Sequence, residues 1–292
     1  MRSARRLLQR KQRERSGRFL VEGPQAVREC TTTASSIFVS PQAATRYGDL
    51  ISAARSAGVP VLLSDAVDRL SDAATPQGIV AVHPLVTVGP QVLPTPLEDR
   101  MPHRPSSPPS RSSSETETPS EVETPSETET PSETATPRLW VIAAQIRDPG
   151  NLGTVIRCAD AFGADGVLLT AGSVDPHNPK AVRATVGSLF HLPVVTGVTL
   201  PEAVEQCRRA GLTVLAADGA GNTDLAELAA TGGLAGPAAW LFGNEAWGLP
   251  EEDSALADTV VRIPMWGAAE SLNLSTAAAV CLYTTAAAQR AR

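Results

Sequence analysis

Short apolar runs alternate with segments of helical pattern throughout the chain after residue 138. Continuous apolar runs of this length are typical of buried strands. They are Leu139–Ala144, Gly166–Thr170, Val194–Val198, Thr213–Ala217, Ala238–Phe242 and Val260–Ile263. The helical segments between them are Leu152–Phe162, Pro179–Ser188, Pro201–Ala210 and Leu272–Ala288. This alternation predicts an α/β domain over residues 138–292, with a parallel sheet and helices on both of its faces.

The first 88 residues show the same alternation on a smaller scale. The pattern predicts four strands, at Phe19–Val21, Ile37–Val39, Val59–Leu63 and Gly78–Val82. It predicts helices at Gln25–Glu29, Ala43–Ala57 and Asp65–Ser71. We therefore expect a smaller α/β domain over residues 1–88.

Residues 89–137 lack both patterns. They are rich in Pro, Ser, Thr and Glu, and contain the near-repeat SETETPSE–VETPSETETPSETATP. A segment of this composition buries too little apolar surface to offset its ordering entropy. We predict a disordered linker, extended by its own negative charge. Its unusual length puts a fixed arrangement of the two domains in doubt.

Charge is unevenly distributed along the chain. The linker holds nine acidic and three basic residues, which accounts for the whole net charge of −6. Residues 1–18, in contrast, carry eight basic residues and one acid, Glu14. A local basic cluster favours contact with nucleic acid. The alternative is a disordered or solvated helical tail.

Composition argues against several other classes of protein. The four cysteines form no CxxC pair, and no cluster of His, Cys and carboxylates has metal-ligand spacing, so we expect no metal site. Isolated cysteines fit a reducing compartment. No apolar run approaches the ~18 residues of a membrane span, and none follows the basic N-terminus as in a secretory signal. We expect a cytoplasmic protein without a membrane partner.

Three segments combine strands with loops of glycine and small polar residues. They are DPGNLGTVIRCADAFGADGVLL at 148–169, LFGNEAWGLP at 241–250 and IPMWGAAESLNLSTAAAV at 263–280. Such loops let a ligand lie against bare backbone N–H and C=O groups. The third segment then opens a helix, which places hydroxyl and amide groups at a helix start.

These segments resemble the motifs of the SpoU-type (TrmH-like) RNA ribose methyltransferases of the SPOUT class, in register from about Leu139 to the end. RFLVEGPQAVREC and TPQGIVAV are similar to the ribosomal-protein-like, RNA-binding domain that precedes many catalytic domains of this family. The resemblance implies that the last segments of the catalytic domain pass through a deep trefoil knot. We also expect a homodimer formed through this domain.

The resemblance implies S-adenosylmethionine as the methyl donor. In the family, the positions of Gly243, Ile263 and Leu272 enclose its adenosyl group, largely through backbone contacts. Asn244 and Met265 are assigned to the same cofactor site. From the residues alone, the apolar side chains among these would be interpreted as core.

Five polar residues of the motifs are the expected catalytic residues: Asn151, Arg157, Glu245, Ser271 and Asn273. From the residues alone, they include a helix cap (Asn151), a solvated helix arginine (Arg157) and a surface acid (Glu245). The resemblance places Arg157 over the reacting ribose, and Ser271 and Asn273 between cofactor and substrate. Because a guanidinium is almost always protonated, we favour a role for Arg157 in binding phosphate and polarising the hydroxyl. The proton acceptor stays open between Arg157, Glu245 and an RNA phosphate.

The predicted activity is direct in-line transfer of a methyl group to a ribose 2′-hydroxyl, which restricts the substrate to RNA. The N-terminal domain favours ribosomal RNA over transfer RNA. The rival hypothesis is an RNA-binding protein of the same fold that has lost catalysis. Trp247 and Trp266 either stack on adenine or an RNA base, or simply pack. His191 is interpreted as structural.

Overall fold

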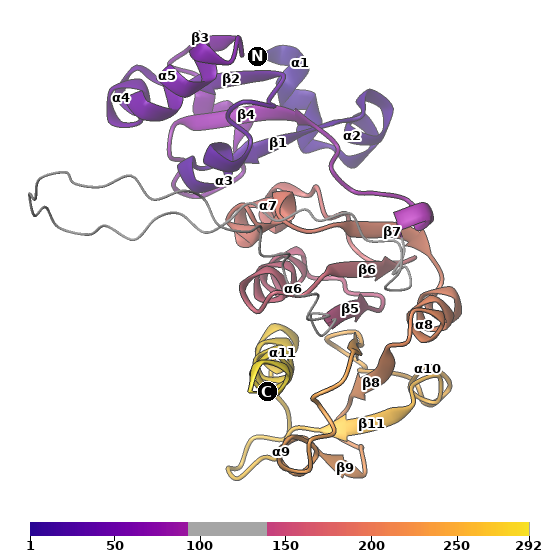
Figure 1. Ribbon diagram of the computed structural model, residues 1–292. Coiled ribbons are helices and arrows are strands. Elements are labelled where there is room, and N and C mark those ends of the chain that lie inside the picture. The colour runs from indigo at the N-terminus through magenta and orange to yellow at the C-terminus, as the bar shows by residue number, and fades with distance from the viewer. Residues whose placement is uncertain (93–138, 292) are drawn as a thin grey trace, which may run out of the picture.

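The computed structural model describes residues 1–92 and 139–291, and all structural statements below refer to these residues. Two sheets stacked along the molecule organise these residues, one from each end of the chain (Figure 1). Most of the predicted linker, residues 89–137, lies outside the described residues.

The N-terminal sheet has four strands in the order β1-β4-β2-β3. These are β1 (Arg18–Glu22), β2 (Ser36–Val39), β3 (Val61–Leu63) and β4 (Ile79–Pro84). All neighbours are antiparallel except β2 and β3. Helix α3 (Pro24–Glu29) matches its prediction. The single helix predicted over Ala43–Ala57 is wrong, because the chain breaks at Tyr47 (φ −115°, ψ 41°) into α4 (Pro41–Arg46) and α5 (Gly48–Ser56). The turn predicted as helical over Asp65–Ser71 is a short 3₁₀ helix, η2 (Val67–Leu70).

The basic N-terminal segment is folded onto this sheet. It forms α1 (Arg2–Arg5), the 3₁₀ turn η1 (Arg6–Leu8) and α2 (Arg10–Ser16). Ala4 and Leu7 are buried in one cluster with Leu20 and Val82 of the sheet. The alternative of a disordered tail is therefore wrong, because apolar residues spaced between the arginines anchor the segment.

The C-terminal sheet has seven strands, all parallel, in the order β7-β6-β5-β10-β8-β11-β9. They are β5 (Leu139–Ala143), β6 (Gly166–Thr170), β7 (Val194–Val198), β8 (Thr213–Ala217), β9 (Thr223–Asp224), β10 (Ala238–Phe242) and β11 (Thr259–Arg262). The parallel sheet is confirmed, and six strands lie where their apolar runs predict. The two-residue β9 at the edge carries no apolar run and was not predicted.

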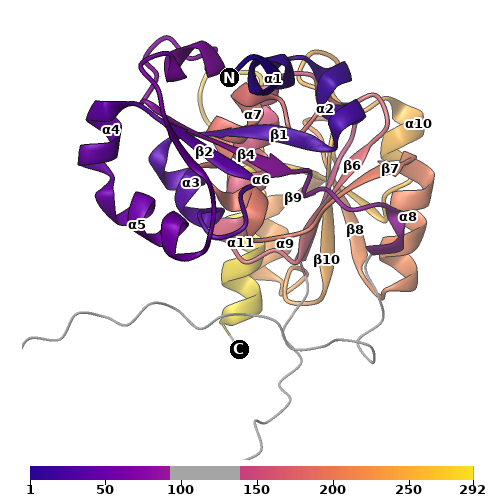
Figure 2. The ribbon, with the colours of Figure 1, turned by 90° about the horizontal axis from the view of Figure 1, so that it is seen from above.

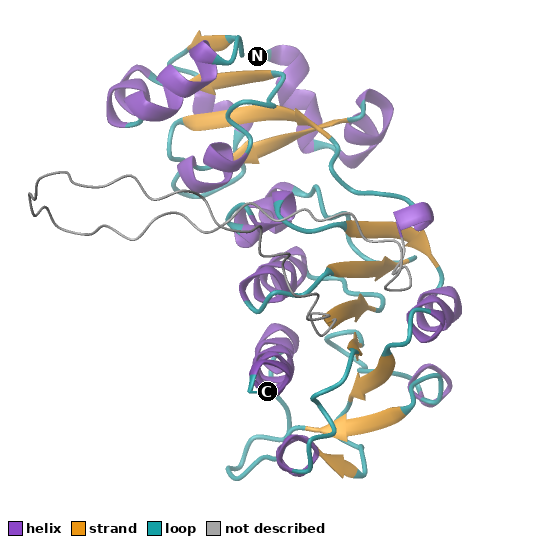
Figure 3. Cartoon of the chain, in the orientation of Figure 1, coloured by secondary structure: helices purple, strands orange, loops and turns teal. Residues whose placement is uncertain are grey.

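Helices cover both faces of this sheet, as predicted (Figures 1 and 3). They are α6 (Pro149–Ala161), α7 (Pro179–Thr185), α8 (Leu200–Arg209), α9 (Leu225–Ala230), α10 (Glu251–Ser254) and α11 (Leu274–Arg290). Alternate residues of β5 point to opposite cores: Val141 packs in the cluster that includes α6 and α11, whereas Ile142 packs in the cluster that includes α8. The short helices α9 and α10 were not predicted, and α10 buries none of its residues.

The two domains share a packed interface. One hydrophobic cluster contains Phe19 and Val21 of β1 together with Val182 of α7. Arg183 of α7 forms ion pairs with Glu22, at 2.8 Å, and with Asp72. These contacts favour one arrangement of the two domains over the free movement that the linker length suggested. The trefoil knot stays a prediction. Within the described residues, no helix is long and apolar enough to span a membrane.

Candidate functional site

The loops that follow β5, β8, β10 and β11 meet at the carboxyl edge of the C-terminal sheet, the usual ligand-binding edge of parallel sheets. The loops after β8, β10 and β11, with the start of α11, enclose a cavity of about 370 Å³. The cavity is lined by seven of the predicted site residues: Gly243, Asn244, Glu245, Ile263, Met265, Ser271 and Leu272. Sequence positions about 30 residues apart thus converge on one volume.

A chain of hydrogen bonds joins three predicted catalytic residues beside this cavity. The Asn273 side chain donates from Nδ2 to Oδ1 of Asn151, at 3.1 Å. Asn151 donates from its own Nδ2 to Oε1 of Glu245, at 3.2 Å. Glu245 also accepts from the backbone N–H of Arg147, at 3.1 Å, and of Asp148, at 3.0 Å. Both carboxylate oxygens of Glu245 are therefore engaged, and the carboxylate fixes the loop from which α6 begins.

The start of α6 differs from the prediction in one respect. Its N-cap is Asp148, whose Oδ1 accepts from the backbone N–H of Asn151 at 2.9 Å. Asn151 is therefore not the cap, and its amide is free to bridge Glu245 and Asn273. Lys180 donates a hydrogen bond to Oδ2 of Asp148 at 2.8 Å, which lowers the pKa of this carboxyl. Asn273 is the N-cap of α11 and accepts from the N–H of Ser275, so this helix begins at Leu274 instead of Leu272.

Gly243 and Asn244 close the loop after β10. A Cβ at Gly243 would collide with the carbonyl group of Gly248, so the glycine is required by the approach of the loop to itself. The buried Asn244 side chain donates to the carbonyl oxygen of Gln145 at 2.7 Å and accepts from Ala246 N–H at 2.8 Å. Asn244 thereby ties the loop after β10 to the loop after β5.

The two tryptophans lie in different surroundings. Trp247 lines the cavity, is 53% exposed, and has the Arg147 guanidinium 5.9 Å from its ring centroid. Trp266 is 90% exposed and is not part of the cavity lining. Within the single chain, neither ring is packed in the core.

Arg157 lies apart from the other predicted residues. It is exposed on α6, six residues beyond Asn151, and does not line the cavity. Among the residues that the structure describes, it forms no ion pair or hydrogen bond with a side chain. One chain by itself therefore does not bring Arg157 to the cavity.

Sequence reasoning missed several residues of the cavity wall, three of which carry a charge or adjoin one. Asp218 and Gly219 follow β8, and Glu270 precedes Ser271. An acidic residue and a glycine directly after a buried strand were a usable signal for the first two, since the carboxyl ends of parallel strands meet at one edge. Lys180 was also missed, because its pairing with Asp148 spans 32 residues.

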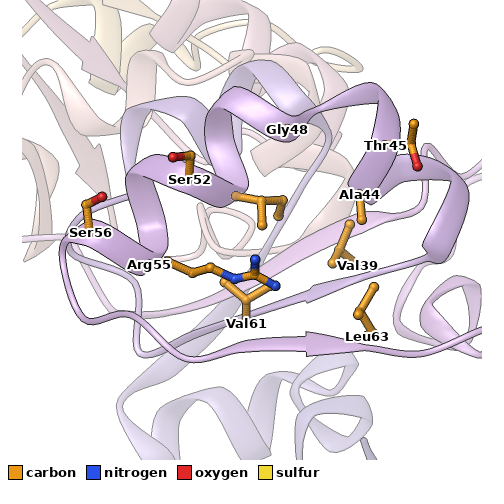
Figure 4. A pocket seen from close by; sticks show the side chains of 10 residues that line it. Val39, Ala44, Thr45, Gly48, Ser52, Arg55, Ser56, Val61 and Leu63 are labelled. Atoms are coloured by element: carbon orange, nitrogen blue, oxygen red, sulfur yellow. The ribbon is translucent and has the colours of Figure 1, made fainter.

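A second cavity, of about 420 Å³, lies in the N-terminal domain between α5 and the strands β2 and β3 (Figure 4). Arg55 extends across it and is its only charged lining residue. It contains none of the predicted site residues. No group of three or more His, Cys, Asp or Glu side chains suited to a metal ion occurs in residues 1–92 and 139–291.

Two family models match the chain. The SpoU rRNA Methylase family model matches residues 138–283, half of the chain, and the MRM3-like substrate binding domain model matches residues 1–81. The chain therefore belongs to the SpoU rRNA methylase family.

Individual relatives agree with this assignment. The chain is 39% identical over 150 residues to the 23S rRNA (uridine(2479)-2'-O)-methyltransferase of Streptomyces viridochromogenes, covering 50% of this chain and 51% of that protein. It is 37% identical over 138 residues to a 23S rRNA (guanosine(2553)-2'-O)-methyltransferase of Bacillus subtilis, covering 47% and 54%. The chain thus spans about half the length of the curated relatives it matches.

A solved structure extends the likeness to both domains. The SpoU methyltransferase AviRb of Streptomyces viridochromogenes, in complex with the cofactor AdoMet, superposes with a TM-score of 0.72 at 25% identity. The match covers 98% of this chain and 96% of that one.

Proposed function

We propose that the protein is an S-adenosylmethionine-dependent methyltransferase that methylates ribose 2′-hydroxyl groups of ribosomal RNA. The observation that carries this proposal is the hydrogen-bonded chain Asn273–Asn151–Glu245 at the edge of the cavity after β10. The printed activities of the two 23S rRNA relatives and the AdoMet complex of AviRb support it.

The cavity suits the proposed cofactor. Its volume of about 370 Å³ falls within the range of small-molecule sites, roughly 300–1,000 Å³. Backbone of the Gly243–Asn244 turn and the side chains of Ile263, Met265 and Leu272 would hold the adenosyl group, since they provide hydrogen-bonding backbone beside an apolar wall. When bound, the cofactor supplies a methyl group already activated by its sulfonium centre.

The protein's own residues then mainly orient the ribose. The Asn151 amide is held at one end by Glu245, which lines the cavity, and at the other by Asn273, and these two bonds limit its rotation. Such orientation of reacting groups contributes several kcal/mol to catalysis, and roughly 7–11 kcal/mol when the groups are well aligned. Because three N–H donors already occupy the Glu245 carboxylate, we assign Glu245 to orientation and leave Arg157 or an RNA phosphate as the proton acceptor.

Cofactor titration separates this proposal from its rival, an RNA-binding protein that has lost catalysis. We expect calorimetry to show saturable binding of S-adenosylmethionine, and the tritiated cofactor to label an in-vitro-transcribed 23S rRNA more than a transfer RNA transcript. Asn151→Ala is the matched variant: it should lose transfer and keep cofactor binding, because Asn151 does not line the cavity. RNA binding without cofactor binding would support the rival and refute the proposal.

The proposal includes an assembly and a domain plan. We assign residues 1–88 to RNA binding, 89–137 to a linker and 138–292 to catalysis in a cytoplasmic homodimer joined through the catalytic domain. The solvent-exposed position of Arg157 supports a site completed outside the single chain. Sedimentation equilibrium should give twice the chain mass of 30.5 kDa, and a monomer that is fully active would contradict the homodimer.

A further inference from the structure

The basic helix α2 contacts the loop that follows β6, at the carboxyl edge of the C-terminal sheet where the catalytic cavity also lies. Seen from above in Figure 2, α2 and α10 are on the same side of the molecule, whereas Figure 1 shows that they lie at different heights. Seven of the eight basic residues in the first 18 are exposed, and the exception is Arg13, which is 3% exposed. Arg13 is thus the basic residue whose buried contacts can fix the position of the exposed basic residues of α2.

Arg13 joins α2 to the catalytic domain. Its Nη2 and Nε donate to Oδ2 of Asp175, at 2.6 and 2.9 Å, and its Nη1 donates to the carbonyl oxygens of Leu7 and Leu8, both at 2.9 Å. The pair is largely buried, with side-chain exposures of 3% and 13%. Burial alone would raise the pKa of Asp175, but hydrogen bonds from His177 and Arg13 hold it well below its usual range. The Asp175 carboxylate therefore stays charged over the physiological pH range.

Asp175 belongs to a loop that touches the catalytic loop after β5. The backbone N–H of Val174 donates to the carbonyl oxygen of Ile146 at 2.8 Å. Lys180 lies two residues after Asn178, the N-cap of α7, and its Nζ donates to Oδ2 of Asp148 at 2.8 Å. The next backbone groups along the catalytic loop, from Arg147 and Asp148, are the ones that Glu245 accepts. A continuous series of contacts thus connects α2 to the cavity.

The outward face of α2 carries unpaired positive charge. Lys11 and Arg15 are one helical turn apart, and each lies about 160° around the helix from Arg13, so they point outward where Arg13 points inward. Both are exposed, and neither has an ion-pair partner in the described part of the chain. Arg10 differs, because it pairs with Glu14 at 2.8 Å.

We propose that Arg13 is a positioning residue: through Asp175 it fixes Lys11 and Arg15 so that RNA phosphates bound by α2 lead to the Asn151–Glu245 site. This rests on the proposed function and extends it by naming a surface that crosses the domain boundary. RNA is the fitting partner because Lys and Arg side chains along one helix face neutralise successive phosphates.

The test compares Lys11→Gln/Arg15→Gln in two backgrounds, the natural chain and Asp175→Asn, with an in-vitro-transcribed 23S rRNA. In the natural chain, loss of two phosphate contacts should flatten the log–log salt slope of RNA binding by about 1.4 and weaken binding about tenfold near 0.15 M salt. In the Asp175→Asn background the same double change should alter the RNA dissociation constant less than twofold, since α2 is no longer held. Arg46→Gln/Arg55→Gln removes two exposed charges on α4 and α5 and should leave RNA binding unchanged.

The outcomes separate positioning from a merely structural role. If Asp175 only stabilised the fold, Asp175→Asn would lower the melting temperature while the double change kept its full effect, and the inference would be overturned. An unchanged salt slope for the double change in the natural chain would overturn it as well. Arg13→Lys keeps the positive charge and replaces Asp175→Asn as the test variant if Asp175→Asn does not fold. It should weaken RNA binding with cofactor affinity unchanged. RNA binding is measured without turnover, so absence of methyl transfer by the natural chain refutes the proposed function and leaves this test intact.

Discussion

Replacing Glu245 by glutamine is expected to weaken catalysis by misplacing Asn151 and to leave the proton transfer step unaffected. The carboxylate accepts from Arg147 N–H through Oε2, and from Asp148 N–H and the Asn151 amide through Oε1. Glutamine retains one oxygen for Asp148 and Asn151. Its amide NH₂ then faces the N–H of Arg147, donor against donor.

The magnitude follows from these contacts. A hydrogen bond to a charged group contributes about 1.5–3 kcal/mol. Glu245 is exposed, so the lower end, about 1.5 kcal/mol, is appropriate, and that equals roughly tenfold in kcat/KM. The two remaining bonds lose their charge assistance, which about halves them and brings the expected loss to roughly 10–100-fold.

The pH profile of kcat/KM for RNA methylation distinguishes orientation from proton abstraction. If Glu245 only orients, Glu245→Gln keeps the acid limb of the profile, and its effect is not additive with that of Asn151→Ala. A general base would instead contribute up to roughly 10⁴-fold, and its acid limb would vanish. Glu270→Gln is the control, because Glu270 lines the same cavity and has no hydrogen-bond partner within the described residues. Disappearance of the acid limb in Glu245→Gln alone would refute the reasoning.

Three further outcomes are expected. Arg157→Ala should abolish methyl transfer with cofactor affinity nearly unchanged in calorimetry, because Arg157 lies outside the cavity; loss of cofactor binding by a folded variant would contradict its assignment. Gly153→Ala should cost about 1–3 kcal/mol in the free energy of unfolding, measured by denaturant titration, because its Cβ would collide with the backbone carbonyl of Ala181 in α7; an unchanged midpoint would contradict this packing. His191 is hydrogen-bonded to carboxylates of both domains, and although burial lowers its pKa these partners raise it above the ordinary value. Its stabilising effect should therefore be full below pH ~6.5 and disappear as pH rises through the higher folded pKa, and His191→Gln should remove that pH dependence from the melting temperature.

The positions of the strands in the catalytic domain could be predicted from the local sequence alone. The run at Ala238–Phe242 is apolar at every position, and β10 has the predicted ends. A strand covered on both faces needs apolar residues throughout, so a continuous apolar run indicates that the strand is buried on both faces. The convergence of the loops at one sheet edge also followed, because parallel strands place their carboxyl ends together.

Contacts between residues far apart in the chain decided the rest. The prediction of Asn151 as a cap rested on neighbours alone; in the structure Asp148 takes the cap, and Asn151 pairs with Glu245 and Asn273, which are 94 and 122 residues away. Arg13 looked like one more solvated cation among eight, and became the buried partner of Asp175 across 162 residues. Local patterns report which side chains are apolar or charged, whereas the partner of a polar side chain is set by the packing of whole domains, because a buried charge is tolerated only where that packing supplies its counter-charge.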